Sequence, residues 1–142
     1  IKAFYFSYFF RWSMYENYEF IKSNLKNFKT NPHGRTEGTF TNFDSLDDKI
    51  DDLYYYMQFI KFGFGRCVRD ASRLIHSNHL SREEAIEHVK NFDGEVPKRY
   101  NNEILKYFEM NELTFNEIIN KHRNNEIWEK HKNNWKLKFD LF

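Results

Sequence analysis

This chain of 142 residues has one cysteine, Cys67, and almost no net charge. A single cysteine excludes an intramolecular disulfide framework and a multi-cysteine zinc site within the chain, and it is typical of a reducing cytosol. We therefore predict a cytoplasmic location. The formal net charge is +1, with basic residues scattered among acidic ones. No overall field attracts nucleic acid, so no nucleic-acid partner is expected.

The chain also lacks a long apolar run. Its most hydrophobic stretch opens the sequence and ends at Arg11, which is too short for a transmembrane helix, and the marks of a signal peptide are missing. The aromatic-rich pattern predicts a buried strand over residues 3–10. One strand needs a sheet, and no second strand is evident downstream. We therefore expect sheet partners from outside the chain, either a longer protein or a second copy in a homo-oligomer.

Metal-ligand patterns are missing as well. The six histidines form no His-Glu-x-x-His motif, and His76 and His79 have no cysteine partners, so we predict no metal site. Cys67 follows Arg66 and precedes Arg69, and such neighbours can lower the pKa of a thiol. A lone cysteine early in a helix is nevertheless more often a packing residue.

Capping signals divide the rest of the chain into helices. Ser13 and Ser81 have capping-box spacing to the glutamates three residues later, and so does Thr114. The expected helices cover residues 14–28, 46–62, 67–77, 81–92, 98–108 and 114–123. Asp44 or Ser45 is expected to cap the second of these helices, and the tail from residue 127 to be a short helix followed by an extended end. The predicted fold class is therefore mainly α.

Four aspartates, at positions 47, 48, 51 and 52, gather at the start of the second expected helix. They can form a Mg²⁺ site or a partner for a cationic group. They can equally be charges that the helix dipole favours at an N-terminus. The second interpretation is favoured for Asp47 and Asp48, and both stay open for Asp51 and Asp52, which lie one turn deeper.

The end of the same helix carries Gly63-Phe-Gly-Arg66. A dinucleotide fingerprint would need a third glycine and a preceding strand. The motif is therefore a helix C-cap or a substrate-binding turn on which Lys61, Arg66 and Arg69 converge. Arg66 beside two glycines favours the turn, because its planar fork of donors suits phosphate or carboxylate.

Several stretches resemble the C-terminal part of the N-acetyl sugar amidotransferases, the bacterial enzymes described as lipopolysaccharide biosynthesis proteins. They are Thr41-Asn-Phe, Lys49-Ile-Asp-Asp52, Tyr55-Tyr-Met-x-Phe-Ile-Lys-Phe-Gly-x-Gly-Arg66, Ala71-Ser72, Ser81-Arg-Glu-Glu-Ala85, Phe92-Asp-Gly94, Pro97 and Tyr100. The resemblance is strongest from Gly38 to Pro97.

The resemblance implies an ATP pyrophosphatase-type enzyme with an α/β nucleotide-binding domain. ATP with Mg would adenylate the N-acetyl carbonyl of a sugar or nucleotide-sugar, and ammonia from a separate glutaminase subunit would replace AMP to give an acetamidino group. The family's Ser-Gly-Gly-x-Asp-Ser phosphate loop and its cysteine pairs are absent from this chain. We therefore expect residues 1–33 to be the tail end of the α/β domain, with one strand left from it, and residues 34–142 to be the helical C-terminal region. This chain alone is expected to bind no cofactor and to be inactive.

No catalytic residue is evident in the sequence. Substrate-side contacts are expected from Lys49, Asp52, Lys61, Gly63, Gly65 and Arg66, all in the stretches that resemble the family. A non-catalytic helical module that docks a glutaminase through aromatic residues is the alternative function. A helical nucleic-acid-binding domain is a third, which the balanced charge disfavours.

Overall fold

The computed structural model describes residues 1–132 and 134–142 and is mainly helical there, which confirms the predicted fold class. The elements are the 3₁₀ turn η1 (Phe6–Tyr8), the helices α1 (Met14–Asn24), α2 (Asp51–Phe62), α3 (Arg66–His76), α4 (Arg82–Phe92), α5 (Asn101–Tyr107) and α6 (Glu112–Lys121), and the strands β1 (Trp128–His131) and β2 (Asn134–Leu137).

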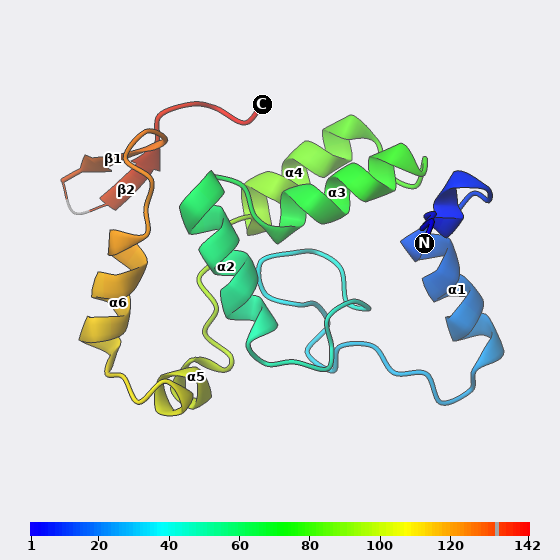
Figure 1. Ribbon diagram of the computed structural model, residues 1–142, viewed down its shortest axis with the longest axis horizontal. Coiled ribbons are helices and arrows are strands. Elements are labelled where there is room, and N and C mark those ends of the chain that lie inside the picture. Colours follow the sequence, from blue (N-terminus) through cyan, green and yellow to red (C-terminus); the bar gives the residue numbers. More distant parts are fainter. Residues whose placement is uncertain (133) are drawn as a thin grey trace.

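The helices α3 and α4 form the centre of the molecule. They lie side by side (Figure 1) and enclose a small apolar cluster of Cys67, Ala71, Ala85 and Val89. Helix α2 leads directly into α3, and the long loop between α1 and α2 runs beneath them (Figure 1). This arrangement brings the loop, α2 and α3 together, and the candidate site lies among them.

Two of the three predicted caps are present, and the third is replaced. Ser13 Oγ accepts the Glu16 amide, and Ser81 with Glu84 forms a complete capping box. At α6 the cap is Asn111, whose Oδ1 accepts the Thr114 amide at 2.9 Å, so the box predicted from Thr114 is wrong. Asn111 lies three residues before Thr114, which is the spacing between an N-cap side chain and the backbone amide that donates to it, so the helix begins before Thr114.

Three helices are shorter than predicted. Helix α1 ends at Asn24, α2 begins at Asp51, and α5 begins at Asn101. Before α2, Ser45 has a φ of 53° and neither it nor Asp44 caps the helix. Before α5, the amides of Lys98 and Arg99 donate to Glu37 Oε2, which fixes them in a tertiary contact in place of a helical turn.

The strand predicted at residues 3–10 is wrong. The segment makes local hydrogen bonds, from the Tyr8 amide to Tyr5 O and from the Phe9 amide to Phe6 O, and all of residues 1–12 are exposed. A strand would need a neighbour to pair its backbone groups, whereas a 3₁₀ turn pairs some of them within the segment.

The helix predicted in the C-terminal tail is also wrong. Strands β1 and β2 form an antiparallel hairpin with Trp128 opposite Leu137 and Lys130 opposite Trp135. The Trp128 indole anchors it to α2, since Nε1 donates to Ile60 O at 2.7 Å. Alternation of apolar and charged residues over a few positions is the strand pattern, and the anchored indole gives the hairpin a surface to pack on.

Within the described part of the chain, no helix is long and apolar enough to cross a bilayer.

Candidate functional site

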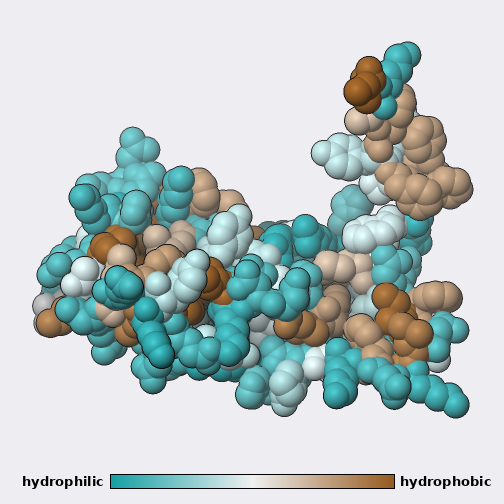
Figure 2. Space-filling view, turned by 60° about the horizontal axis from the view of Figure 1, so that its bottom comes forward, coloured by the Kyte–Doolittle hydropathy of each residue, from teal (hydrophilic) through white to brown (hydrophobic). Residues whose placement is uncertain are grey.

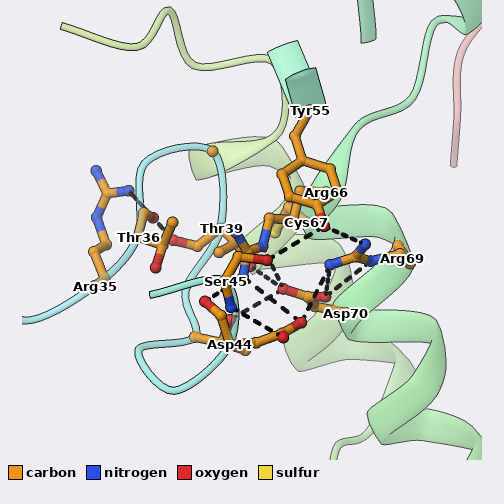
Figure 3. Close-up of polar contacts among 12 residues, drawn as sticks. Arg35, Thr36, Thr39, Asp44, Ser45, Tyr55, Arg66, Cys67, Arg69 and Asp70 are labelled. Atoms are coloured by element: carbon orange, nitrogen blue, oxygen red, sulfur yellow. Dashed lines mark hydrogen bonds and ion pairs between the residues drawn. The ribbon is translucent and has the colours of Figure 1, made fainter. Parts of the chain in front are cut away.

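The site begins with an ion pair inside α3. Arg66 and Asp70 stand one helical turn apart, so their side chains meet on one face. Both are buried, at 1% and 0% exposure, with Arg66 Nε 3.4 Å from Asp70 Oδ2. Arg66 Nη2 also donates to the backbone oxygen of Asp44 at 2.8 Å, which ties α3 to the loop before α2 (Figure 3).

Threonines from the loop complete the shell around Asp70. The hydroxyls of Thr39 and Thr41 donate to Asp70 Oδ2 at 2.8 and 3.0 Å, and Arg69 donates to Asp70 Oδ1 at 3.2 Å. The Tyr55 ring of α2 lies against both guanidinium groups, 4.7 Å from Arg66 and 4.4 Å from Arg69 (Figure 3). A buried carboxylate with this many donors is well stabilised, so the network fixes the loop on α2 and α3.

A second ion pair fastens the loop to the segment after α4. Arg35 and Glu95 pair through two contacts of 2.7 and 2.8 Å, and Glu95 Oε2 also accepts the Gly38 amide at 2.9 Å. The bond to Arg35 is the main reason why the pKa of Glu95 is lowered. Both ion pairs hold the same loop, so its residues are positioned rigidly.

Between these ion pairs lie two polar cavities that meet at Asp52. The outer one has a volume of about 180 Å³ and the inner one about 10 Å³. Asp52 lines both cavities. The outer cavity is also lined by Asn31, Pro32, Thr36, Ser45, Leu46, Asp47, Asp48, Lys49, Arg99 and Tyr100. The inner cavity is also lined by Glu37, Gly38, Tyr55, Tyr56, Arg66, Gly94 and Glu95.

Asp52 has the electrostatics of an acid–base group. Its residue is 7% exposed, and burial raises the pKa of its carboxyl to about 6, with a further contribution from Glu37. Arg99 and Arg66 oppose that rise. No hydrogen bond to its carboxylate occurs among the described residues. A carboxyl group with these properties can take or give a proton near neutral pH.

Arg66 Nη1 is a hydrogen-bond donor in the same cavity as the Asp52 carboxyl group. It is buried and has no hydrogen-bond partner within residues 1–132 and 134–142. Since Arg66 lines the inner cavity together with Asp52, the cavity places a cationic donor and a carboxyl group of raised pKa around one small space.

The structure brings together three of the six residues predicted to contact substrate. Lys49, Asp52 and Arg66 line the cavities, and Lys49 is also paired with Glu103. Lys61, Gly63 and Gly65 line neither cavity. Lys61 is exposed at the far end of α2, so only Arg66 and Arg69 of the expected trio converge.

Gly63 and Gly65 both contribute to the structure of the turn between α2 and α3. Gly63 ends α2 with a φ of 79°, and an added Cβ would lie 3.0 Å from Leu137 of the hairpin. The Gly65 amide donates to Asp93 Oδ2 at 2.8 Å, and Asp93 Oδ1 accepts the Cys67 and Val68 amides. Asp93 thus caps α3 from a distant part of the chain.

Cys67 is a packing residue. It is fully buried, and burial raises the pKa of its thiol to about 12, so the effect of the neighbouring arginines does not produce a reactive thiolate.

The described residues do not form a metal site. No three His, Cys, Asp or Glu side chains among them lie close enough to hold a metal ion. The four clustered aspartates divide, since Asp52 is buried and Asp47 and Asp48 are exposed. The sequence also has no glycine-rich phosphate loop. These residues therefore do not fit ATP with Mg.

Sequence reasoning did not single out Asp70, Thr39, Glu37, Glu95 or Asp93. The spacing of Arg66 and Asp70 was the one local signal for the central ion pair. The other four meet their partners across 25 to 62 positions of sequence, and no local pattern reports such contacts.

The fold and the site define a helical domain whose centre is a buried ion-pair network. Residues 37–140 match the family described as "LPS biosynthesis protein WbpG-like, C-terminal domain". The chain therefore belongs to this family of lipopolysaccharide (LPS) biosynthesis proteins. A search of curated proteins found no match.

Proposed function

We propose that this chain is the C-terminal domain of an ATP-dependent amidotransferase that converts a sugar N-acetyl group to an acetamidino group in bacterial surface-polysaccharide biosynthesis. The observation that carries the proposal is the family match over residues 37–140. The resemblance of the Lys49–Asp52 and Tyr55–Arg66 stretches to N-acetyl sugar amidotransferases supports the finer activity. A cytoplasmic location, where sugar precursors and ATP are present, is part of the proposal.

The chemistry requires a proton acceptor. When ammonia attacks the activated carbonyl carbon, the new C–N bond leaves the nitrogen with an extra proton, which must depart before the activated oxygen leaves. We assign this role to Asp52, because a carboxyl of pKa about 6 accepts a proton at neutral pH. The outer cavity of about 180 Å³ is large enough for a small polar group such as an acetamido group.

Lys49 and Arg66 are proposed as the substrate-side neighbours of Asp52, because Lys49 lines the outer cavity, Arg66 lines the inner one and Asp52 lines both. Lys61, Gly63 and Gly65 stay predictions, since they lie outside these cavities. Binding of ATP and Mg belongs to another part of the enzyme, because the residues described here do not fit them.

The test uses the complete gene product that contains this chain. We would incubate it with ATP, Mg, isotope-labelled ammonium and a panel of nucleotide-linked N-acetyl sugars, and follow by mass spectrometry the exchange of the amide oxygen for labelled nitrogen. Asp52→Asn should lower kcat/KM by about 100-fold, the usual effect of losing a general base. The matched control is Asp51→Asn, whose side chain lines neither cavity.

Two results would contradict the proposal. If no sugar in the panel gives labelled product, the proposed amidotransferase activity is wrong. Equal activity of Asp52→Asn and Asp51→Asn would leave the activity but remove the role of Asp52.

A second candidate function is a non-catalytic module that docks a glutaminase subunit. The observation in its favour is the exposed aromatic segment of residues 4–12. Figure 2 shows apolar side chains gathered on an arm that projects from the right of the molecule, where Figure 1 places the N-terminal end. Sedimentation of the chain with a glutaminase subunit should show a complex that Phe6→Ser weakens. Labelled product that requires Asp52 would favour the enzyme instead.

A further inference from the structure

A larger cavity runs along the outside of α2 and shares Tyr56 and Gly94 with the lining of the inner cavity at Asp52. It is a groove of about 680 Å³ between α2, the end of α6, the hairpin and the C-terminal tail. This volume lies in the range of small-molecule sites. Its aromatic lining consists of Tyr56, Phe59, Trp128, Trp135, Phe139 and Phe142.

The groove has one pre-arranged cation. The Arg123 guanidinium lies 4.7 Å from the ring centroid of Trp128 and 5.3 Å from that of Trp135. The hairpin register puts these two indoles on the same face, since Trp128 pairs with Leu137 and Trp135 with Lys130. The bond from Trp128 to Ile60 O holds the first indole in place. The indoles therefore fix the plane of the guanidinium before any ligand arrives.

Arg123 has no carboxylate partner among the described residues. Among the described residues, Nε donates to Asn120 Oδ1 at 3.3 Å and Tyr56 lies close to the guanidinium, but no carboxylate occupies the two terminal nitrogens. Burial lowers the pKa of Arg123, and the nearby Tyr56 opposes this effect. A half-buried guanidinium costs desolvation energy that a protein usually recovers with an anion.

The other charged residues of the groove also favour an anion. Lys90 and Lys136 also line the groove, against one acidic residue, Asp140. Trp135 is half-buried and Phe139 is exposed, so aromatic faces remain available for stacking. The groove therefore offers an anion site and a stacking surface side by side.

We propose that this groove binds an organic phosphate, with Arg123 gripping the phosphate and the aromatic side chains stacking on the ring of the ligand. Two ligand sources share this chemistry, a sugar phosphate and a nucleotide. The planar fork of Arg123 can bind two phosphate oxygens at once. The proposal concerns binding alone and does not rest on the amidotransferase activity, although Tyr56 and Gly94 line both this groove and the inner cavity at Asp52.

Binding can be measured by tryptophan fluorescence. Trp12→Phe removes the tryptophan outside the groove and leaves Trp128 and Trp135 as reporters. Titrations would use glucose phosphate, uridine monophosphate, inorganic phosphate and glucose. We expect saturable quenching by at least one of the two organic phosphates, weaker binding of inorganic phosphate and none of glucose. Preference between the first two probes tells whether the ring is a sugar or a nucleobase.

The variants test the role of Arg123. Arg123→Met should weaken binding of the preferred probe by about 10- to 100-fold, the range for loss of charge-assisted hydrogen bonds. Arg123→Lys keeps the charge, should fold as the native chain does, and should recover only part of the affinity, because an ammonium cannot reproduce the fork. The matched control is Lys121→Met, an exposed cation of α6 outside the groove.

Three results would overturn the proposal. The first is the absence of a saturable signal with either organic phosphate. The second is binding of inorganic phosphate as tight as that of both organic phosphates. The third is full affinity in both Arg123→Lys and a folded Arg123→Met.

Discussion

The loop of residues 36–41 and the opening segment of residues 1–12 differ in burial in the opposite sense to the one that their composition suggests. The loop is polar and is buried, with Thr36 at 2% and Thr39 at 0% exposure. The opening segment is rich in phenylalanine and tyrosine and is exposed, with Phe6 at 66%. Hydropathy alone would assign the two regions the other way round.

Hydrogen bonding explains the difference. The Thr39 and Thr41 hydroxyls bond to Asp70, and the Thr36 amide bonds to Thr41 O at 3.0 Å, so burial leaves these groups satisfied. In the opening segment, residues 1–10 make local turn hydrogen bonds and ring contacts such as Phe6 with Phe10, whose centroids are 4.8 Å apart, and Arg11 donates to Ser77 O at 3.2 Å. Burial of a segment depends on whether the fold offers partners for its backbone and side chains.

Breaking the ion pair at the centre of the buried region should have the largest effect. Asp70→Ala removes the buried carboxylate that pairs with Arg66 and Arg69, and Arg66→Ala removes the fully buried cation of the same network. Each should lower the free energy of unfolding by about 3–5 kcal/mol. Urea denaturation measures this loss, with the exposed Asp47→Ala as control. A loss below about 1 kcal/mol for either variant would show that the network does not hold the fold.

The remote cap of α3 should come next. Asp93→Ala removes the acceptor of the Gly65, Cys67 and Val68 amides and should cost about 2–3 kcal/mol, because these bonds involve a charged group. Asp93→Asn keeps one acceptor oxygen and should cost less. Thermal denaturation compares the two, and equal melting temperatures for Asp93→Ala and the native chain would contradict the cap.

Asp52 is buried without hydrogen bonds like those made to Asp70, so its ionisation at high pH should lower the free energy of unfolding. Its pKa rises from 3.8 to about 6 on folding. The folded state therefore binds the proton more tightly, and this stabilisation is complete below about pH 4 and is lost as the pH rises to about 6. Asp52→Asn should be more stable than the native chain by about 2 kcal/mol at about pH 8 and equal to it below about pH 4.

Unfolding curves at several pH values measure this prediction. Asp51→Asn serves as the control and should show no comparable trend. A stability difference for Asp52→Asn that does not change with pH would mean that folding does not shift the pKa of Asp52.

A pair of opposite substitutions should give the smallest and most direct comparison. Thr39→Val makes the buried loop more hydrophobic and should still cost about 1 kcal/mol, because Asp70 loses a donor. Phe6→Ser makes the exposed segment more polar and should change stability by less than about 0.5 kcal/mol. Chemical denaturation under one condition measures both. The reverse order would restore hydropathy as the controlling factor.

The sequence predicted the helices well where the signal was local. Ser13 and Ser81 marked two helix starts, and Gly63 marked one end. The predictions failed where a distant residue competed. Residues 98–100 were expected to be helical, whereas the amides of Lys98 and Arg99 donate to Glu37. Residues 3–10 were expected to be a strand, but the segment has no strand partner. For the site, Asp52 and Arg66 were identified from their motifs, but the side chains that surround them were not.

Local patterns in the sequence were enough to predict the helical class, most helix boundaries and the likeness to lipopolysaccharide biosynthesis proteins, because capping, periodicity and motif spacing are properties of neighbouring residues. The tertiary structure was needed to see that the Arg66 guanidinium pairs with Asp70 and donates to Asp44 O. It was also needed to see that Asp52 lines two cavities and that Arg123 lies near two indoles. These arrangements join residues far apart in the chain. Burial, pairing and the resulting pKa of a group depend on what the fold places beside it, and no local pattern carries that information.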